Sequence, residues 1–348
     1  MVRVASYNVS LTRRGPGVLL RDIRAGKDRQ IGAVLQIITR VRPDILVLSG
    51  FDYDADQAAL GAFGRALKKR GVAYPYIFSR APNSGLRSGV DLDGDGKTDG
   101  PGDAQGYGRF FGAGGMAVLS RLPIIASEVQ DYTAGLWRDF PGALKPRDAL
   151  GRIFPSRQAW KIQRLSSTNH WVVPVRLGPG RLLHLLISHP TPPVFDGAED
   201  RNGRRNHDEV AFWSRLIGQG GVLPPFVVAG DLNIDPLDGA GRKDAIQGLL
   251  SSRVLQDPAP SSTGAILAVR RQGGANLTHR TPAGLDTVDW DERKGPGNMR
   301  VDYVLPSADL KVVAAGVFWP PPGRKAARLV RAAAKGGTRH HLVWVDLQ

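Results

Sequence analysis

Two polar side chains stand at the end of an apolar run in the second half of the chain. The run that starts at Val227 ends in Asp231 and Asn233, and Pro236 stops it. A short apolar run bounded by turn formers is typical of a buried strand. Alternation would place Asp231 and Asn233 on one face, where a carboxylate and a carboxamide can position a water molecule and hold an oxyanion. An ordinary strand-end turn explains the pair equally well.

Four further polar side chains stand at the ends of expected strands. Asn8 closes the first strand, His189 follows a later one, Asp302 begins another, and His340 precedes the last. Each has a simple structural explanation by itself, and a lone histidine is usually structural. Together they are groups that acid–base chemistry uses, because imidazole titrates near neutral pH and a carboxylate can orient it.

The elements that must position these residues alternate along the chain, which predicts a layered α/β fold. The spacing of apolar residues predicts helices at residues 28–40, 55–70, 207–216 and 243–253. Expected strands span 2–9, 44–50, 116–120, 124–126, 170–177, 181–188, 227–234, 300–305, 310–318 and 341–347. Of these, 116–120 and 124–126 are expected to pair around a turn, and 170–177 and 181–188 to form a hairpin.

No shift in composition marks a linker, so we interpret residues 1–348 as one domain. It carries a Gly/Asp-rich insertion at about 80–115 and an irregular insertion at about 131–166. No apolar run approaches the roughly 18 residues of a membrane span. The first strand begins at Val2 and leaves no room for a signal peptide, although an earlier trimmed signal would make the protein secreted or periplasmic. The compartment therefore stays open, and we expect a monomer.

Composition allows a large core and excludes several kinds of site. Of 348 residues 42% are hydrophobic, so disulfides are not needed for stability. The absence of cysteine excludes thiol catalysis and thiolate metal sites. With 47 Lys and Arg against 32 Asp and Glu, the net charge is +15, which favours polyanionic partners: nucleic acid, phosphorylated substrates or an anionic membrane surface. A general solubility charge is the alternative.

The first insertion contains a segment like the first half of a calcium loop. Asp91, Asp93, Asp95 and Asp99 place carboxylates at alternate positions, with glycines at the turn. Gly102 occupies the twelfth position, where a bidentate glutamate would complete such a loop. The segment is consistent either with weak Ca²⁺ binding or with a plain acidic turn.

The order of these segments resembles the endonuclease/exonuclease/phosphatase superfamily, in particular its bacterial branch. The resemblance covers essentially the whole chain and rests on ASYNVS, ILVLSGFDYD, GMAVLSRLPI, SHPTPPVFDGAEDRNGRRNHDE, VVAGDLNIDP, RVDYVLPS and HHLVWVDL. It implies the DNase I-like fold, an α/β four-layer sandwich of two packed mixed β-sheets flanked by helices.

The resemblance also implies roles for the polar residues. His340 would act as general base or would polarise the attacked phosphate, oriented by Asp302. Asp231 and Asn233 would align water and bind phosphate, and His189 would protonate the leaving oxygen or bind a phosphate oxygen. Asn8 would help to hold both the phosphate and a metal ion. By the same resemblance Mg²⁺ or Mn²⁺ is expected, with Asn8 and Asp231 among its ligands.

Two family ligand positions are replaced in this chain. Gly50 stands where the family places a metal-binding glutamate, and Arg339 stands where it places an aspartate directly before the catalytic histidine. Hard oxygen ligands of this kind are what Mg²⁺ or Mn²⁺ requires, so the metal site is expected to be weakened. Either Asp52 reaches in as a substitute ligand, or Arg339 binds phosphate and replaces the charge of the metal, or the chain is catalytically inactive.

The segment before His340 carries a row of cations. Arg324, Arg328, Arg331 and Lys335 would form a basic stripe if residues 323–335 are helical, and such a stripe suits non-specific binding of a phosphate backbone. A solvated helix face is the alternative.

Two hypotheses about function follow from the sequence. The first is a phosphoester hydrolase, either a phosphatase or a phosphodiesterase/nuclease, with a weakened metal site. The second is an inactive relative that binds phosphorylated ligands or nucleic acid. The substrate, whether a nucleic acid, a lipid head group or a small phosphoester, stays open.

Overall fold

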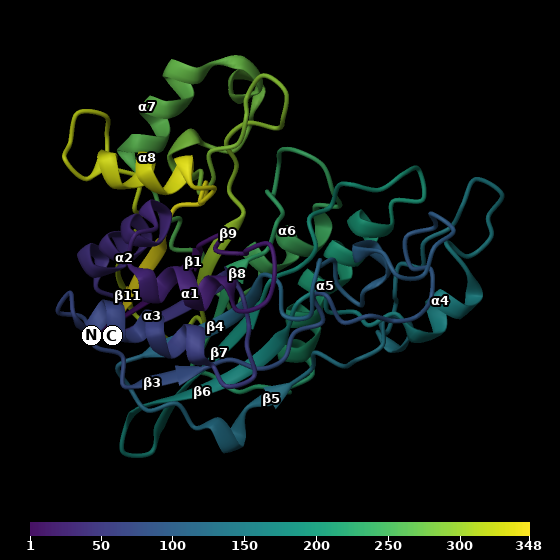
Figure 1. Ribbon diagram of the computed structural model, residues 1–348, viewed down its shortest axis with the longest axis horizontal. Coiled ribbons are helices and arrows are strands. Elements are labelled where there is room, and N and C mark those ends of the chain that lie inside the picture. The colour runs from purple at the N-terminus through teal and green to yellow at the C-terminus, as the bar shows by residue number, and fades with distance from the viewer.

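A computed structural model describes all residues, 1–348, and contains two mixed β-sheets. The first sheet has the order β10-β11-β1-β2-β4-β3 (Figure 1). Its strands are β1 (Val2–Asn8), β2 (Ile45–Phe51), β3 (Tyr76–Phe78), β4 (Gly115–Ser120), β10 (Val312–Val317) and β11 (Val343–Leu347). Strand β1 lies parallel to β2 and antiparallel to β11. The C-terminal end of β1 and the N-terminal end of β11 therefore lie at the same end of the sheet.

The second sheet has the order β5-β6-β7-β8-β9. Its strands are β5 (Gln130–Asp131), β6 (His170–Gly178), β7 (Arg181–Ser188), β8 (Phe226–Asp231) and β9 (Asp302–Pro306). Strands β6 and β7 form the expected hairpin. Strand β8 runs parallel to β7 and antiparallel to β9, which places Asp231 directly opposite Asp302.

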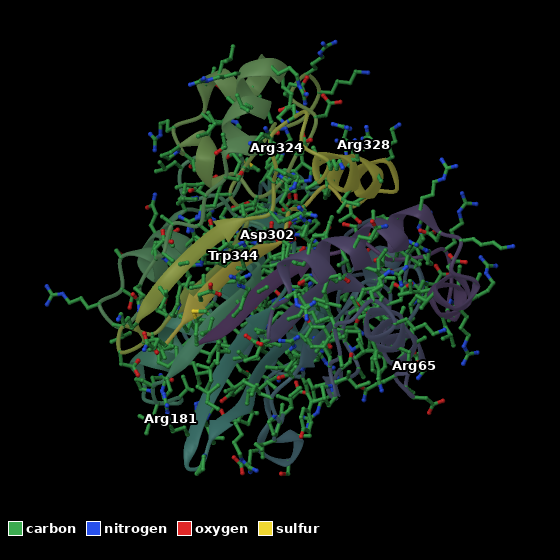
Figure 2. All side chains as sticks on the ribbon, turned by 90° about the vertical axis from the view of Figure 1, so that its left-hand side faces the viewer. Arg65, Arg181, Asp302, Arg324, Arg328 and Trp344 are labelled. Atoms are coloured by element: carbon green, nitrogen blue, oxygen red, sulfur yellow. The ribbon has the colours of Figure 1, made fainter.

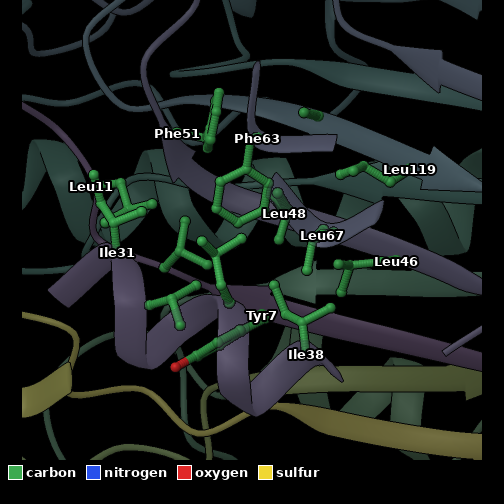
Figure 3. Close-up of a cluster of buried hydrophobic side chains, with 14 of the residues drawn as sticks. Tyr7, Leu11, Ile31, Ile38, Leu46, Leu48, Phe51, Phe63, Leu67 and Leu119 are labelled. Carbon is green, nitrogen blue, oxygen red and sulfur yellow. The ribbon is translucent and has the colours of Figure 1, made fainter. Parts of the chain in front are cut away.

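Helices cover the outer face of each sheet. The helices are α1 (Val18–Ala25), α2 (Arg29–Val41), α3 (Ala58–Lys68), α4 (Arg157–Ile162), α5 (Arg201–Gly218), α6 (Asp244–Leu250), α7 (Thr263–Gln272) and α8 (Ala327–Lys335). Helices α1, α2, α3 and α8 pack on the first sheet, and Figure 3 shows part of the apolar cluster between them, including Tyr7, Ile38 and Leu46. Helices α5 and α6 pack on the second sheet, on a separate apolar cluster that includes Trp213.

A third apolar cluster fills the space between the sheets. It includes Val4 and Val345 from the first sheet and Val173, Ile187 and Val227 from the second. Successive side chains of a strand point to opposite faces of the sheet. Each sheet therefore buries one face against helices and the other face against the second sheet. The resulting order of helices, sheet, sheet and helices confirms the expected four-layer α/β sandwich. No helix combines the length and the apolar character needed to cross a membrane.

Local signals explain the element that the sequence predicted best. Helix α2 begins after Asp28, whose side chain accepts a hydrogen bond from the backbone N–H of Ile31 at 2.8 Å. Its apolar face, including Ile31, Val34 and Ile38, is buried against the first sheet. Spacing at three and four residues therefore identified the buried face correctly.

Three expectations about elements were wrong or incomplete. Residues 124–126 do not pair with β4: Ile124 bridges Val175 of the second sheet, so this turn carries the chain from one sheet to the other. Helix α5 begins at Arg201 instead of residue 207, because the polar residues before 207 bury their side chains instead of forming a loop. Helices α1, α4 and α7 were not predicted.

Candidate active site

An open cleft of about 720 Å³ lies where polar strand ends of the two sheets meet. Asn8 at the end of β1 and Asp231 at the end of β8 line it, together with His189 after β7 and His340 before β11. Strand pairing across both sheets brings these residues together although they are up to 332 positions apart in sequence, as the numbers 8 and 340 show. The expected constellation is therefore present as one cleft.

One carboxylate oxygen lies at the centre of the cleft. Asp231 Oδ2 accepts a hydrogen bond from Asn8 Nδ2 at 2.8 Å. His189 Nε2 lies 3.4 Å from the same oxygen and His340 Nε2 lies 3.7 Å from it. Burial favours the neutral carboxyl, but the charges of His340 and His189 and the hydrogen bonds of His189 and Asn8 outweigh it and lower the pKa of Asp231 to about 2. Asp231 is therefore a carboxylate at neutral pH.

Asn233 reaches the cleft by a turn and not by strand alternation. The strand ends at Asp231, and Asn233 has φ of 54°, in the left-handed region. Its backbone N–H donates to Asp231 Oδ1 at 2.9 Å, while its Nδ2 donates to the carbonyl of Pro190 at 2.9 Å. Asn233 thus joins Asp231 to the loop that follows His189. The expectation that Asp231 and Asn233 share one face of a strand is wrong, because the two residues are joined by a turn.

His340 and Asp302 form the expected pair. His340 Nδ1 lies 2.9 Å from Asp302 Oδ2, which leaves Nε2 facing the cleft. Burial disfavours the imidazolium, but the charges of Asp302 and Asp231 and the hydrogen bond with Asp302 outweigh burial and raise the pKa of His340 to about 9. Burial raises the pKa of Asp302 to about 6. His340 consequently carries its proton at neutral pH in this arrangement.

The turn that carries His340 is tied to the first sheet by buried polar contacts. Gln30 Nε2 donates to the carbonyl of Ser10 at 2.9 Å and to Thr338 Oγ1 at 2.8 Å. The Thr338 hydroxyl donates in turn to the carbonyl of Val9. These contacts hold the residues before His340 against the end of β1, where Asn8 lies.

Gly50 leaves no room for a side chain. Its φ is +68°, and an added Cβ would lie 2.6 Å from Asn8 Oδ1 and 3.0 Å from the backbone nitrogen of Ser10. The register of β2 against β4 shifts at this point, between Ser49 and Phe51. The space beside Gly50 is thus filled by the Asn8–Ser10 turn, in which Asn8 Oδ1 accepts a hydrogen bond from the Ser10 N–H at 3.0 Å.

Asp52 does not line the cleft. Its Oδ2 accepts a hydrogen bond from the Arg13 N–H and its Oδ1 from the Gly114 N–H, both at 2.8 Å. Burial raises the pKa of this carboxyl to about 6, and the two backbone hydrogen bonds act against that rise. Asp52 holds two cleft loops together, and the structure does not bring it to Asp231 as the expected substitute ligand.

Arg339 also lies away from the cleft. Its side chain is exposed, and Nη1 lies 3.3 Å from the carbonyl oxygen of Asp289. The structure therefore does not place Arg339 among the residues that line the cleft, and phosphate binding by Arg339 stays a prediction. Three other arginines line it: Arg13, Arg14 and Arg109. The basic turn at Arg13 and Arg14 was visible in the sequence, whereas no pattern marked Arg109.

The oxygen donors of the cleft do not fit a Mg²⁺ or Mn²⁺ ion. Asp231 is the sole carboxylate among the lining residues, and three nitrogen donors face its Oδ2. Asn8 Oδ1 already accepts from Ser10. Asp302 and His340 supply further ligand atoms within 4.8 Å of Asp231, but both are engaged with each other. Such ions prefer several oxygen ligands, which this arrangement does not present.

The acidic segment in the first insertion gathers part of the expected set. Ligand atoms of Asp91, Asp93 and Asp95 lie within 4.8 Å of one another, and Asp99 is not part of this group. A Cβ at Gly102 would lie 1.7 Å from Asp93 Oδ2, so a side chain at this position would require the Asp93 carboxylate to move. The carboxylates accept backbone hydrogen bonds within the loop, for example Asp91 from Gly96 at 3.0 Å. Calcium binding stays a prediction.

Comparison with known proteins decides the family. The sequence model described as "Endonuclease/Exonuclease/phosphatase family" matches residues 5–340. This chain belongs to that family. A search of curated proteins gave no significant match.

Solved structures of family members share the fold. An endonuclease/exonuclease/phosphatase family protein from Leptotrichia buccalis has 14% identity and a TM-score of 0.54, with 100% of both chains covered. An endonuclease/exonuclease/phosphatase from Beutenbergia cavernae has 18% identity and a TM-score of 0.52, with 100% of this chain and 71% of that chain covered. These likenesses confirm the DNase I-like fold. Enzymes of the endonuclease/exonuclease/phosphatase family act on phosphoesters and typically use a divalent cation.

Proposed function

We propose that this protein is a phosphoester hydrolase, a phosphatase or a phosphodiesterase/nuclease, with a metal site weakened relative to its family. The observation that carries the proposal is the alignment of Asp302, His340 and Asp231 across the cleft, at 2.9 Å and 3.7 Å. Three arginines and one carboxylate line the same cleft, so it attracts a phosphate. Family membership supports the same class of reaction.

The ionisation of the cleft assigns a role to each group in this proposal. Asp231 is ionised at neutral pH, so it can align the attacking water as a hydrogen-bond acceptor and take its proton once the new bond to phosphorus makes that water strongly acidic. His340, with its pKa of about 9, is positively charged and stabilises the charge that develops on phosphorus-bound oxygens, which favours the polarising role over that of a base. Water oxygen then bonds to phosphorus while the bond to the leaving oxygen breaks. His189 donates a proton to that leaving oxygen.

The remaining polar residues bind and position the phosphate. Asn8 and His340 hold the oxygens nearest Asp231, and Asn233 positions the loop that carries His189 through its contact with Pro190. Arg14 and Arg109 supply cationic charge from the exposed side of the cleft. No step of this scheme depends on Asp52 or Arg339.

A rate assay tests the proposal. The protein is assayed on a generic phosphodiester, a phosphomonoester and plasmid DNA, in EDTA and with Mg²⁺, Mn²⁺ or Ca²⁺. His340→Ala should lower the rate by about 10²-fold or more, because it removes charge stabilisation from the cleft. His279→Ala, which changes a histidine outside the cleft, should leave the rate unaltered. Turnover that survives His340→Ala would contradict the proposal.

A second candidate is a catalytically inactive member of the family that binds phosphorylated ligands or nucleic acid. It is favoured by the lack of room for a side chain at Gly50 and by the single carboxylate in the cleft. This candidate predicts phosphate binding, measured by calorimetry, without turnover under any metal condition. Turnover that depends on His340 would exclude it.

A further inference from the structure

A second hollow lies next to the cleft, between helices α1, α2 and α8. It has a volume of about 910 Å³ and is lined by side chains from all three helices and from the turn at Arg13 and Arg14. Figure 2 shows Arg328 on α8, above the purple helices of the N-terminal segment. Apolar residues of α2 and α8 pack together beneath it, so its floor is fixed by the core. We call this hollow the α8 groove.

The α8 groove is strongly cationic. Seven cationic side chains and two carboxylates line it, which leaves a net formal charge of +5. Both carboxylates, Asp22 and Asp28, pair with the half-buried Arg13 at 3.1 Å. Five of the cations are exposed and make no ion pair: Arg14, Arg29, Arg328, Arg331 and Lys335. Free cations at this density favour an anionic ligand with several charges.

The α8 groove and the cleft share a wall. Arg13 and Arg14 line both hollows, so a ligand that leaves the cleft past Arg14 enters the groove. A small phosphoester fills the cleft alone and does not reach the cations of α8. A chain molecule with many phosphates can occupy both hollows at once, which gives the unpaired cations a ligand.

The spacing of the cations on α8 suits a phosphate chain. Arg328, Arg331 and Lys335 all line the groove, and seven residues of helix span about 10 Å. Along one strand of duplex DNA, phosphates are about 3.4 Å apart on the axis, so this row can face about three of them. Arg324, the fourth residue of the predicted basic stripe, precedes the helix and does not line the groove.

The lining of the groove does not suit a membrane surface. Its two hydrophobic residues are Val18 and Ala332, and neither is a large exposed side chain. Peripheral membrane sites combine cations with exposed apolar side chains that enter the lipid. The cations here line a concave surface, which a flat bilayer would contact only at its rim.

We propose that the α8 groove binds the sugar–phosphate backbone of a nucleic-acid strand whose neighbouring phosphodiester lies in the cleft. This inference rests on the proposed function for the role of the cleft, and it names a nucleic acid as the substrate class. The backbone contacts are electrostatic and carry no base sequence, so binding is expected to be insensitive to sequence and steeply dependent on salt.

Binding measured in EDTA tests the groove apart from catalysis. Fluorescence polarisation of a labelled 20-nucleotide single strand is recorded over a range of salt concentrations for the unaltered protein and for Arg328→Glu/Arg331→Glu. The double variant should bind on the order of tenfold more weakly at low salt, and its slope of log K against log salt should be shallower by about 1.4, as expected for two lost phosphate contacts. Arg328→Gln/Arg331→Gln provides a second variant that introduces no acidic side chain.

A matched pair of cations outside the groove provides the control. Arg324→Glu/Lys325→Glu makes the same change in net charge just before α8, at exposed residues that line neither hollow. Its oligonucleotide affinity should stay within about twofold of the unaltered protein, since it removes no groove contact. Equal losses in both variants would overturn the proposal and assign binding to net charge alone.

Two further outcomes separate the groove from its alternatives. Flotation with phosphatidylserine vesicles that depends on Arg328 and Arg331, without oligonucleotide binding, would overturn the proposal in favour of a membrane surface. Oligonucleotide binding that the groove variants weaken, in a protein that hydrolyses nothing, would support the groove and refute the proposed hydrolase. Absence of binding together with turnover of small phosphodiesters would refute the groove and leave the hydrolase standing.

Discussion

At the scale of single residues, the neighbours of each cleft group decide what it can do. Asp231 stays ionised because nitrogen donors surround Oδ2, and His340 stays protonated because two carboxylates lie beside it. Because Gly50 has no side chain, the Asn8 amide can occupy the space that a Cβ would need. Asn8 in turn donates to Asp231, so the backbone at Gly50 supports the charge distribution of the cleft.

Gly50→Ala should destabilise the fold by about 1–3 kcal/mol, because alanine is strained at positive φ and its Cβ would displace Asn8. Urea unfolding measures the change. Gly64→Ala serves as control, since Gly64 lies within α3 with open space around it, and there alanine should stabilise by up to about 1 kcal/mol. A Gly50→Ala protein as stable as the unaltered one would show that Asn8 and Ser10 adjust freely.

At the scale of elements, α5 does more than cover the second sheet. Its first turns bury polar side chains that hold loops from distant parts of the chain. Arg205 donates to the carbonyls of Leu165 at 2.9 Å and Ser166 at 3.0 Å. Asn206 Nδ2 donates to the carbonyl of Thr191 at 2.8 Å. The walls of the cleft therefore depend on a helix that contributes no lining residue itself.

Glu209→Gln tests this support. The Glu209 carboxylate accepts hydrogen bonds from the Ser167 N–H at 2.6 Å and the Thr191 N–H at 2.8 Å, and both of these residues line the cleft. An amide replaces one acceptor by a donor, so we expect a loss of about 1–3 kcal/mol in thermal or urea unfolding and a lower rate in the phosphodiester assay. Glu128→Gln, at an exposed position, should change neither quantity. Unchanged stability in Glu209→Gln would mean that the loops at Ser167 and Thr191 keep their positions without the Glu209 hydrogen bonds.

At the scale of the whole molecule, the sandwich places polar strand ends at one edge and buries acidic groups behind it. Asp286 is one of these: burial, followed by the charges of Asp235 and Asp238, raises the pKa of its carboxyl to about 8. A carboxyl whose pKa is higher in the folded state than its unfolded value of about 3.9 holds its proton more tightly when folded. Its effect on stability is absent at low pH and becomes unfavourable as the pH rises from about 4 to 8.

Asp286→Asn should remove this pH-dependent destabilisation. The Tm of the variant, relative to that of the unaltered protein, should rise between pH 5 and pH 8 by about 2 °C or more. Differential scanning fluorimetry over this range measures the difference. Asp309→Asn, at an exposed position, should run parallel to the unaltered protein. A constant difference between Asp286→Asn and the unaltered protein across the range would contradict the assignment of this titration to Asp286.

The sequence alone predicted the layered fold, because most of the long strands and helices, such as α2, show their buried face in the spacing of apolar residues. Through the family resemblance it also predicted that Asn8, His189, Asp231 and His340 would belong to one site. These predictions depend on local patterns and on the family resemblance, and both can be read from the amino-acid sequence without the structure.

Only the tertiary structure decided how the cleft obtains its charge. Asp52 and Arg339 stood at suggestive positions, but backbone N–H groups of distant loops engage the first, and the second points to Asp289. Arg109 and the α8 groove come together through packing between segments far apart in the chain. Side-chain direction and the partners of a carboxylate depend on such long-range contacts, and no local spacing encodes them.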